Sequence, residues 1–128
     1  MAYNLTKMVG YSFQEALEKI KTALSNEGFG VISEIDLKEK FKEKLNVEFR
    51  EYKILGACNP KLAYQAIEQE DKIGVLLPCN VLVQEHENGQ VEVTAVNPME
   101  SMSAVSNPDL ESIASEVSEK LQRVIEVV

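Results

Sequence analysis

Two cysteines occur in similar settings and are the residues of this chain best suited to chemistry. Cys58 lies in the run Gly56-Ala57-Cys58-Asn59-Pro60, and Cys79 lies in Leu77-Pro78-Cys79-Asn80. Each cysteine follows an apolar run and precedes Asn or Pro, which end strands or begin helices. A thiol at such a place can face a cleft, whereas a thiol in mid-strand generally packs in the core. We therefore expect a site, if one exists, at these two segments.

Soft-ligand binding is one chemistry that these residues could support. Thiols and thioethers suit Cu(I) or the edge of a haem rather than Mg²⁺ or Ca²⁺. If the two cysteine strands are neighbours, nearby Asn and Met side chains would share a rim with the thiols, and Met99 and Met102 have the spacing of soft ligands. The expected ligand-binding residues are Cys58, Asn59, Cys79, Asn80, Asn97 and Met99.

A simpler interpretation is that both cysteines are small buried hydrophobes and that each Asn caps a helix or a turn. The cysteines are 21 positions apart, without the CxxC spacing of a redox pair or a zinc knuckle. No base lies near either cysteine in the sequence, and His86 stands alone beside a predicted turn without a His-Glu-x-x-His motif. We therefore predict no catalytic residue and no metal ligand set, and we favour a protein that is not an enzyme.

The composition predicts one domain over residues 1–128 and limits the classes of partner. The net charge of −8 disfavours nucleic acid and anionic membranes, which bind clustered Lys and Arg. Lysines at positions 38, 40, 42 and 44 interleave with Glu39 and Glu43, as on a solvated helix. The chain begins without an apolar segment, and no apolar run approaches the ~20 residues that span a bilayer. A cytoplasmic location with reduced thiols is therefore expected.

Four N-cap signals predict the main helices. Two of them have capping-box spacing, and two pair an Asn with a proline at the first helical position, where its missing N–H is no loss. Apolar residues recur at helical spacing after each signal. The four signals are Ser12 with Glu15, Asp36 with Glu39, Asn59 with Pro60, and Asn107 with Pro108.

Strands are predicted at residues 3–8, 29–35, 50–58, 73–86 and 91–95. The run 73–77 is continuously apolar, as in a strand buried on both faces, and Pro78 interrupts the strand that continues to His86. The resulting order is β-α-β-α-β-α-β-β-α. It predicts an α+β fold with a mixed sheet of about five strands and with helices mainly on one face. The segment 97–106 is the one long irregular stretch.

Asn88-Gly89 predicts a two-residue turn between the last two strands. That turn would pair Glu87 with Gln90 and Val81 with Val96, and would place Cys79 beside Pro98. The ladder should fray at Pro98, which has no N–H to donate. Residues 99–102 would then hang near Cys79.

Four segments together resemble the family known as domain of unknown function 302. They are Glu27-Gly28-Phe29-Gly30-Val31, Leu55-Gly56-Ala57-Cys58-Asn59-Pro60 with Leu62-Ala63-Tyr64, Gly74-Val75-Leu76-Leu77-Pro78-Cys79-Asn80-Val81, and Val96-Asn97-Pro98-Met99. The resemblance covers nearly every predicted element and implies a compact α+β domain. It implies no established activity, substrate or catalytic set.

Three functional hypotheses follow from these observations. We favour a non-enzymatic module that binds a small molecule in a pocket near the two Cys-Asn segments. The first alternative is a thiol redox or soft-metal protein that handles copper or haem, and it requires the two sulfurs to be close together. The second alternative is a homodimeric structural or interaction module, because symmetric pairs are common and open sheet edges need cover.

Overall fold

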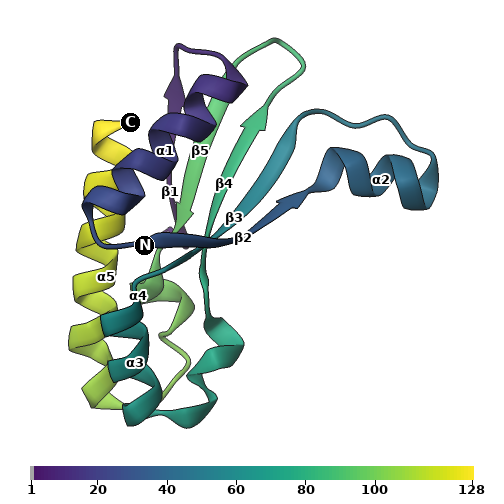
Figure 1. Cartoon of the computed structure of the whole chain (residues 1–128). Helices are drawn as coiled ribbons and strands as arrows, with labels where there is room; N and C mark the ends of the chain where they lie inside the picture. The colour runs from purple at the N-terminus through teal and green to yellow at the C-terminus, as the bar shows by residue number, and fades with distance from the viewer. Residues whose placement is uncertain (1) are drawn as a thin grey trace.

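The computed structural model describes residues 2–128, which form one five-stranded sheet with helices packed on it and around it (Figure 1). In chain order the elements are β1 (Asn4–Val9), α1 (Phe13–Asn26), β2 (Gly30–Asp36), α2 (Leu37–Leu45), β3 (Tyr52–Cys58), α3 (Pro60–Gln69), the 3₁₀ helix η1 (Asp71–Leu76), β4 (Cys79–Glu85), β5 (Val91–Val96), α4 (Pro98–Ser101) and α5 (Pro108–Val127). All four predicted N-caps accept a backbone N–H of the first helical turn.

The sheet has the order β1-β5-β4-β3-β2, and every neighbouring pair is antiparallel. The predicted α+β class and the five strands are confirmed. Where we expected a mixed sheet, the structure has only antiparallel pairs because α2 and α3 do not cross a face of the sheet. They extend beyond the strand ends (Figure 1). The strand after each helix therefore runs back antiparallel beside the strand before it.

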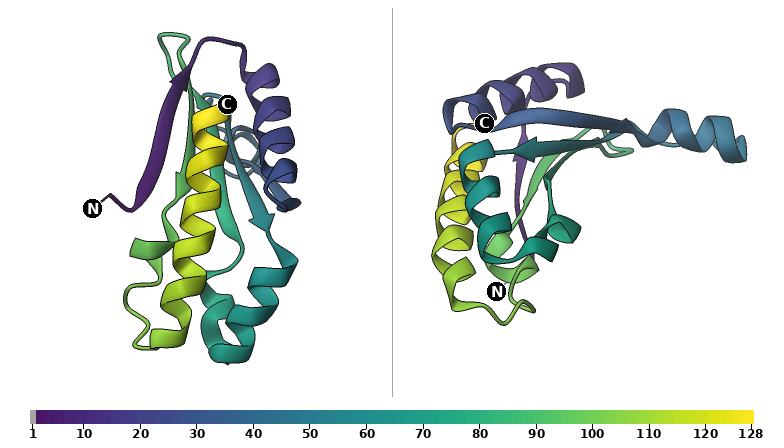
Figure 2. Two further views of the ribbon diagram at one scale, coloured as in Figure 1. Left: turned by 90° about the vertical axis from the view of Figure 1, so that its left-hand side faces the viewer. Right: turned by 60° about the horizontal axis from the view of Figure 1, so that its bottom comes forward.

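Helices α1 and α5 cover one face of the sheet side by side (Figure 2). Strand alternation turns Leu55, Val81 and Val93 toward these helices, where all three are fully buried. Within residues 2–128 no helix covers the opposite face, which is partly polar. The predicted arrangement of helices mainly on one face is therefore correct.

A second, smaller core lies below the sheet, in a part of the molecule that we call the lobe: α3, η1, α4 and the first turns of α5 (Figure 1). Its buried residues come from α3, η1, the C-cap of α4 and α5, and are Ala66, Ile73, Met102, Leu110 and Ala114. The lobe begins where β3 ends and returns the chain to β4, so it lies directly against both cysteines.

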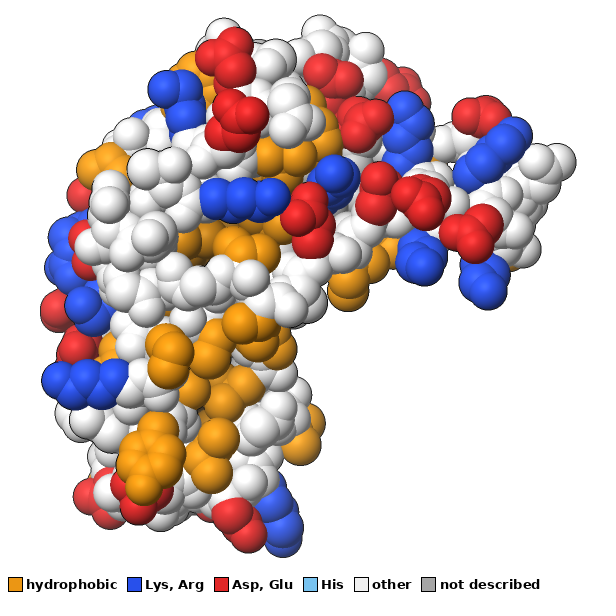
Figure 3. Space-filling view, in the orientation of Figure 1, with side chains coloured by type: hydrophobic (Ala, Val, Ile, Leu, Met, Phe, Trp, Pro, Cys, Tyr) orange, Lys and Arg blue, Asp and Glu red, His pale blue; other side chains and the backbone are white. Residues whose placement is uncertain are grey.

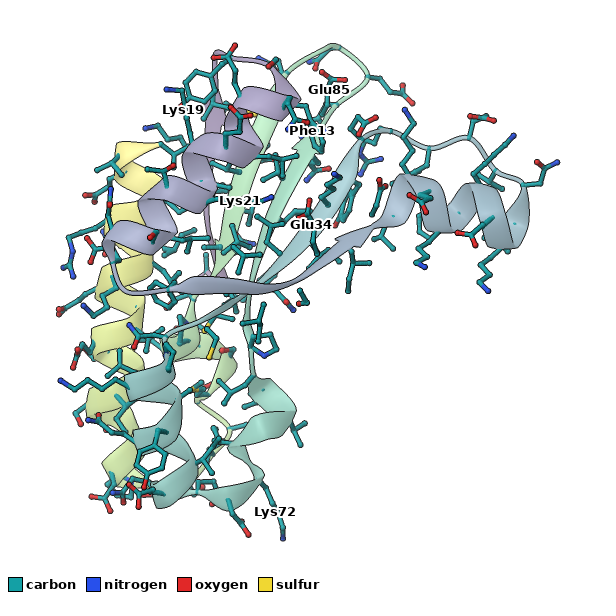
Figure 4. All side chains as sticks on the ribbon, viewed as in Figure 1. Phe13, Lys19, Lys21, Glu34, Lys72 and Glu85 are labelled. Atoms are coloured by element: carbon teal, nitrogen blue, oxygen red, sulfur yellow. The ribbon has the colours of Figure 1, made fainter. Side chains whose placement is uncertain are left out.

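The ends of β2 and β3 continue away from the body as an arm, residues 32–52, which carries α2 (Figure 1). At its root, Glu34 accepts hydrogen bonds from Lys21 of α1 (3.1 Å) and Lys53 of β3 (3.3 Å) (Figure 4). The β2–β3 register slips between Val31 and Ser33, and Gly56 of β3 lies beneath Ser33. A Cβ at Gly56 would overlap Ser33 Oγ and lie 2.8 Å from the Pro78 ring, so the close approach of these segments requires glycine.

The predicted strand at 73–77 is wrong, because residues 71–76 form η1. Glu70 begins η1 by accepting from Lys72 N (3.3 Å), and Leu77 N donates to Gly74 O (3.1 Å). In this run Ile73 is buried while Val75 is 86% exposed, which a strand covered on both faces does not allow. Periodicity alone cannot separate a strand from a short helix in so brief an apolar run.

The predicted hairpin register is off by one residue. His86 N donates to Gln90 O (2.8 Å) and Gly89 N donates to His86 O (2.9 Å), so the loop contains three residues rather than two. Gly89 has a φ of +83°, as in a type I turn followed by a left-handed glycine. Val81 therefore pairs with Ala95 and not with Val96. In the segment expected to be irregular, Asn97 begins the short helix α4.

Candidate functional site

Both cysteines lie where the central strands meet the lobe. β3 and β4 are neighbours, and Ala57 pairs with Cys79, so Cys58 is one residue beyond the partner of Cys79. Cys79 is the first residue of β4 and is 7% exposed, whereas Cys58 is the last residue of β3 and is half-buried. The condition under which the sequence would place both cysteines at one rim, that their strands are neighbours, is thus met in the structure, and both thiols are free.

A small apolar cavity of about 30 Å³ separates the strand ends from α3 and α5. Cys58 and Cys79 both line it, together with Met102 of the segment after α4. Three sulfur-containing residues from three different segments therefore line one space that is large enough for about one water molecule. The remaining lining is mainly aliphatic, with Leu62 and Val117 among it.

The environment makes the Cys79 thiol a weak acid. The pKa of Cys79 is raised from 9.0 to about 11, mainly by burial and to a smaller extent by the electrostatic effect of the nearby Cys58. Desolvation disfavours the charged form because the thiolate loses its hydration. Cys79 is therefore a neutral thiol at physiological pH, and the reactive thiolate that redox catalysis requires is not available there.

Asn59 lies at the rim of the cavity and has a structural task. Its Oδ1 accepts from Leu62 N (3.3 Å) as the N-cap of α3, and its Nδ2 donates to Glu27 O (3.4 Å) at the end of α1. The side chain thereby joins the start of α3 to the α1–β2 connection. Both amide atoms are committed to these bonds.

Asn80 and Asn97 lie away from the thiols. Asn80 pairs with Gly56 and points to the uncovered face of the sheet, because strand alternation turns it away from Cys79. Asn97 is 4% exposed; its Oδ1 accepts from Met99 N (3.2 Å) and Ser118 Oγ (2.9 Å), and its Nδ2 donates to Ala2 O (3.2 Å). Asn97 therefore ties together the starts of β1 and α4 and the middle of α5.

Met99 lines a different and larger hollow, an open depression of about 500 Å³ between α4 and the start of α5. Met102 and Ala114 line both this hollow and the thiol cavity, so the two spaces adjoin at these side chains. The sequence pattern places Ala114 on the apolar stripe of the last helix. That position predicts burial in the core and does not indicate that Ala114 lines a hollow. The spacing of Met99 and Met102 was the one available signal for the larger hollow.

The ionisable side chains of residues 2–128 form no metal site of their own. Among residues 2–128 no group of three or more His, Cys, Asp or Glu side chains is arranged to hold a metal ion. His86 contacts Glu92 (2.9 Å) near the hairpin, and this hydrogen bond lowers the pKa of Glu92. His86 is thus placed on the uncovered face of the sheet, outside the thiol cavity. No helix within the described part of the chain is long and apolar enough to cross a membrane.

Comparison with known proteins places the chain in a family. The profile of the family described as "Domain of unknown function DUF302" matches residues 5–128, which is nearly the whole chain. The chain belongs to the DUF302 family. The solved structures include a DUF302 protein with the same architecture, described as "uncharacterized conserved protein DUF302 from Bacillus stearothermophilus". It is 28% identical, covers 98% of each chain, and superimposes with a TM-score of 0.91.

No curated protein matches this DUF302 chain. The resemblance seen in the sequence motifs is therefore confirmed at the level of family and fold, and it brings no activity with it. The DUF302 motifs around residues 55–60 and 74–81 meet at the thiol cavity, and Pro78 of the second motif lines it. This junction and the hollow beside it are therefore the parts of the molecule best suited to binding.

Proposed function

We propose that this DUF302 domain is a non-enzymatic module that binds a small apolar molecule at the junction of the sheet and the lobe. One observation carries the proposal: the open hollow of about 500 Å³ and the thiol cavity of about 30 Å³ adjoin at Met102 and Ala114. A volume of a few hundred cubic ångströms with mainly apolar walls is typical of small-molecule sites. The proposal takes the thiols as reduced, as in the expected cytoplasmic location.

The lining of the hollow indicates the chemistry of its ligand. Its floor is formed by Met99, Met102 and Leu110, and polar groups such as Ser103 and Glu111 lie at its edge. Methionine is flexible and polarisable, so Met102 can turn and extend the hollow toward the cysteines. A neutral hydrocarbon or aromatic body with one hydroxyl or amine fits this pattern better than an anion does.

Methionine methyl NMR with a neutral fluorescent probe, N-phenyl-1-naphthylamine, tests the proposal. Saturable binding at one probe per chain should shift the ¹³C-methyl signals of Met99 and Met102. The signal of Met8, which is half-exposed on β1 far from the hollow, should not move. The variant Ser103→Trp places an indole at the edge of the hollow and should weaken binding at least about tenfold.

The matched control is Ser25→Trp, which adds the same side chain to an exposed position on α1. It should bind the probe as the unaltered protein does. Equal shifts of all methionine methyls, or equal binding by both tryptophan variants, would show non-specific adsorption and would reject the hollow as the site.

A second candidate function is capture of Cu(I), which is favoured by the three sulfur-containing residues that line one cavity. Two thiols and a thioether are a donor set that Cu(I) accepts, and the metal displaces the thiol protons when it binds. The raised pKa of Cys79 opposes thiol redox catalysis more strongly than it opposes metal capture, because metal binding contributes free energy toward deprotonation. Of the two thiol-based alternatives, metal handling is therefore the better supported.

Competition with a chromophoric Cu(I) chelator tests this second candidate. The protein should take up one Cu(I), and Cys58→Ser and Cys79→Ser should each weaken uptake about a hundredfold or more, since each removes a thiolate ligand. Met102→Leu should weaken it less, and Met8→Leu should leave it unchanged. Failure of the unaltered protein to compete for Cu(I) would exclude the metal function while leaving apolar binding intact.

A further inference from the structure

The arm of this protein contains a helix without a core of its own. α2 has no buried residue, and its apolar side touches the arm through Phe41, which packs edge-on against Phe49 at 5.0 Å. Phe49 in turn lies 5.9 Å from Tyr52. A helix of nine residues is marginal in water by itself, and packing of its apolar face supplies most helical stability. The arm therefore has the construction of an element that packs against a further surface.

Large apolar side chains are exposed on the arm and on the lobe. The two parts form the sides of a right-angled hollow in the outline of the molecule, with apolar atoms along the lobe and beneath the arm (Figure 3). Of the eleven exposed large hydrophobic residues within 2–128, eight belong to these two parts. They are Ile32, Ile35, Leu45 and Val47 on the arm, and Tyr64, Ile67, Val75 and Leu76 on the lobe.

Helix α2 of the arm and the tip of the lobe carry opposite charges. α2 contains four lysines and two glutamates, in a chain whose net charge is −8. Lys40 and Lys44 are exposed on the same side of α2, one turn apart, and no ion pair within residues 2–128 involves them. At the junction of α3 and η1, Glu68 and Asp71 are likewise exposed and unpaired in that part of the chain, beside Lys72 at the lower tip (Figure 4).

The exposed area is too large for a compact monomer by about the amount that one interface would cover. The protein exposes 7481 Å², whereas a monomer of 14.3 kDa is expected to expose about 6800 Å². The excess of roughly 700 Å² is close to the ~800 Å² that each partner contributes to a standard interface. Each chain has one basic helix on its arm and one acidic tip on its lobe. A second copy of this chain therefore supplies a complementary partner for both surfaces.

We propose that two copies of this chain form a symmetric clasp, in which the arm of each copy lies in the angle between the arm and the lobe of the other. The basic side of α2 then meets the acidic junction of α3 and η1 twice, once in each direction, as a two-fold axis requires. The exposed apolar residues of both parts are buried between these charged contacts. The clasp uses neither the thiol cavity nor the hollow proposed to bind the probe. The dimer and the small-molecule binding can therefore fail independently.

Charge reversal with mixing tests the clasp by sedimentation velocity or light scattering. The unaltered protein should be a dimer, about twice 14.3 kDa, at micromolar concentration. The arm variant Lys40→Glu/Lys44→Glu and the lobe variant Glu68→Lys/Asp71→Lys should each dimerise at least about thirtyfold more weakly, because like charges then face each other. An equimolar mixture of the two variants should recover the dimer, since both of its contacts are attractive.

The matched control is Glu15→Lys/Glu18→Lys, which reverses two exposed charges on α1, away from both surfaces. It should remain dimeric, and circular dichroism should show all variants folded. A monomeric unaltered protein, dimeric single-site variants, or a mixture that stays monomeric would each overturn the clasp.

Discussion

At the scale of single residues, the two cysteines that look alike in sequence have different chemical environments. Cys58 is half-buried at the end of β3, while Cys79 is buried and its pKa is raised to about 11. Cys79 pairs with Ala57 within the sheet, whereas Cys58 lies one residue beyond that pair at the end of β3, beside the lobe. This offset accounts for the difference in burial. The sequence singles out these two thiols, but burial decides what each thiol can do.

The raised pKa of Cys79 has a measurable consequence for stability. The unfolded thiol ionises near its usual pKa of 9.0, before the folded thiol does, so the folded state keeps its proton longer. This contribution is fully present below pH 9 and is lost as the pH rises toward 11. Between pH 8 and pH 11 the unaltered protein should lose on the order of 2 kcal/mol more unfolding free energy than Cys79→Ala does.

Urea unfolding of both proteins at several pH values measures this difference, because the other ionisable groups are shared and cancel. Native thiol labelling provides a second readout: Cys58→Ser should abolish the fast reaction at neutral pH, while Cys79→Ser should keep it. Identical pH dependence of the two stabilities would contradict the burial of Cys79.

At the scale of elements, local capping signals were the most dependable guide. Asp36, Asn59 and Asn107 each begin a helix as their positions indicated, because a cap depends on only three or four consecutive residues. The segment 73–77 was misassigned because its apolar residues suit either a strand or a short helix, and packing of Ile73 against the lobe decides between them. The hairpin register was missed because Asn88-Gly89 fits both two-residue and three-residue loops.

The N-cap of α3 connects this element to the rest of the fold, and its loss should be measurable. Asn59→Ala removes the acceptor for Leu62 N and the donor to Glu27 O, and should lower the unfolding free energy by about 1 kcal/mol or somewhat more. Asn59→Asp keeps the cap acceptor and should cost less. Gln65→Ala, on the exposed side of α3, is the control and should change stability by less than about 0.5 kcal/mol.

Chemical denaturation at neutral pH measures all three variants. Equal stability of Asn59→Ala and Gln65→Ala would mean that the cap contributes nothing. A cost for Asn59→Asp as large as that for Asn59→Ala would instead assign the stabilisation to the bond with Glu27.

At the scale of the whole molecule, the sequence predicted the class of the fold but not its shape. Alternating elements led to the α+β assignment, yet nothing in residues 37–45 distinguishes a helix that lies on a sheet from one that extends beyond it. Of the expected site residues, the structure gathers Cys58, Asn59 and Cys79 around one cavity. Asn80 and Asn97 point elsewhere, because strand parity and a buried hydrogen-bond network determine their directions. These are long-range properties of the packed chain.

Gly56, the glycine beneath Ser33, couples the packing on the two faces of the sheet. The Pro78 ring approaches Gly56 on the uncovered face, and the same proline lines the thiol cavity. Any side chain larger than hydrogen at position 56 would push that ring and displace the start of β4. A disturbance of the outer surface would thus be transmitted through a single backbone position to the protected interior, where Cys79 begins its strand.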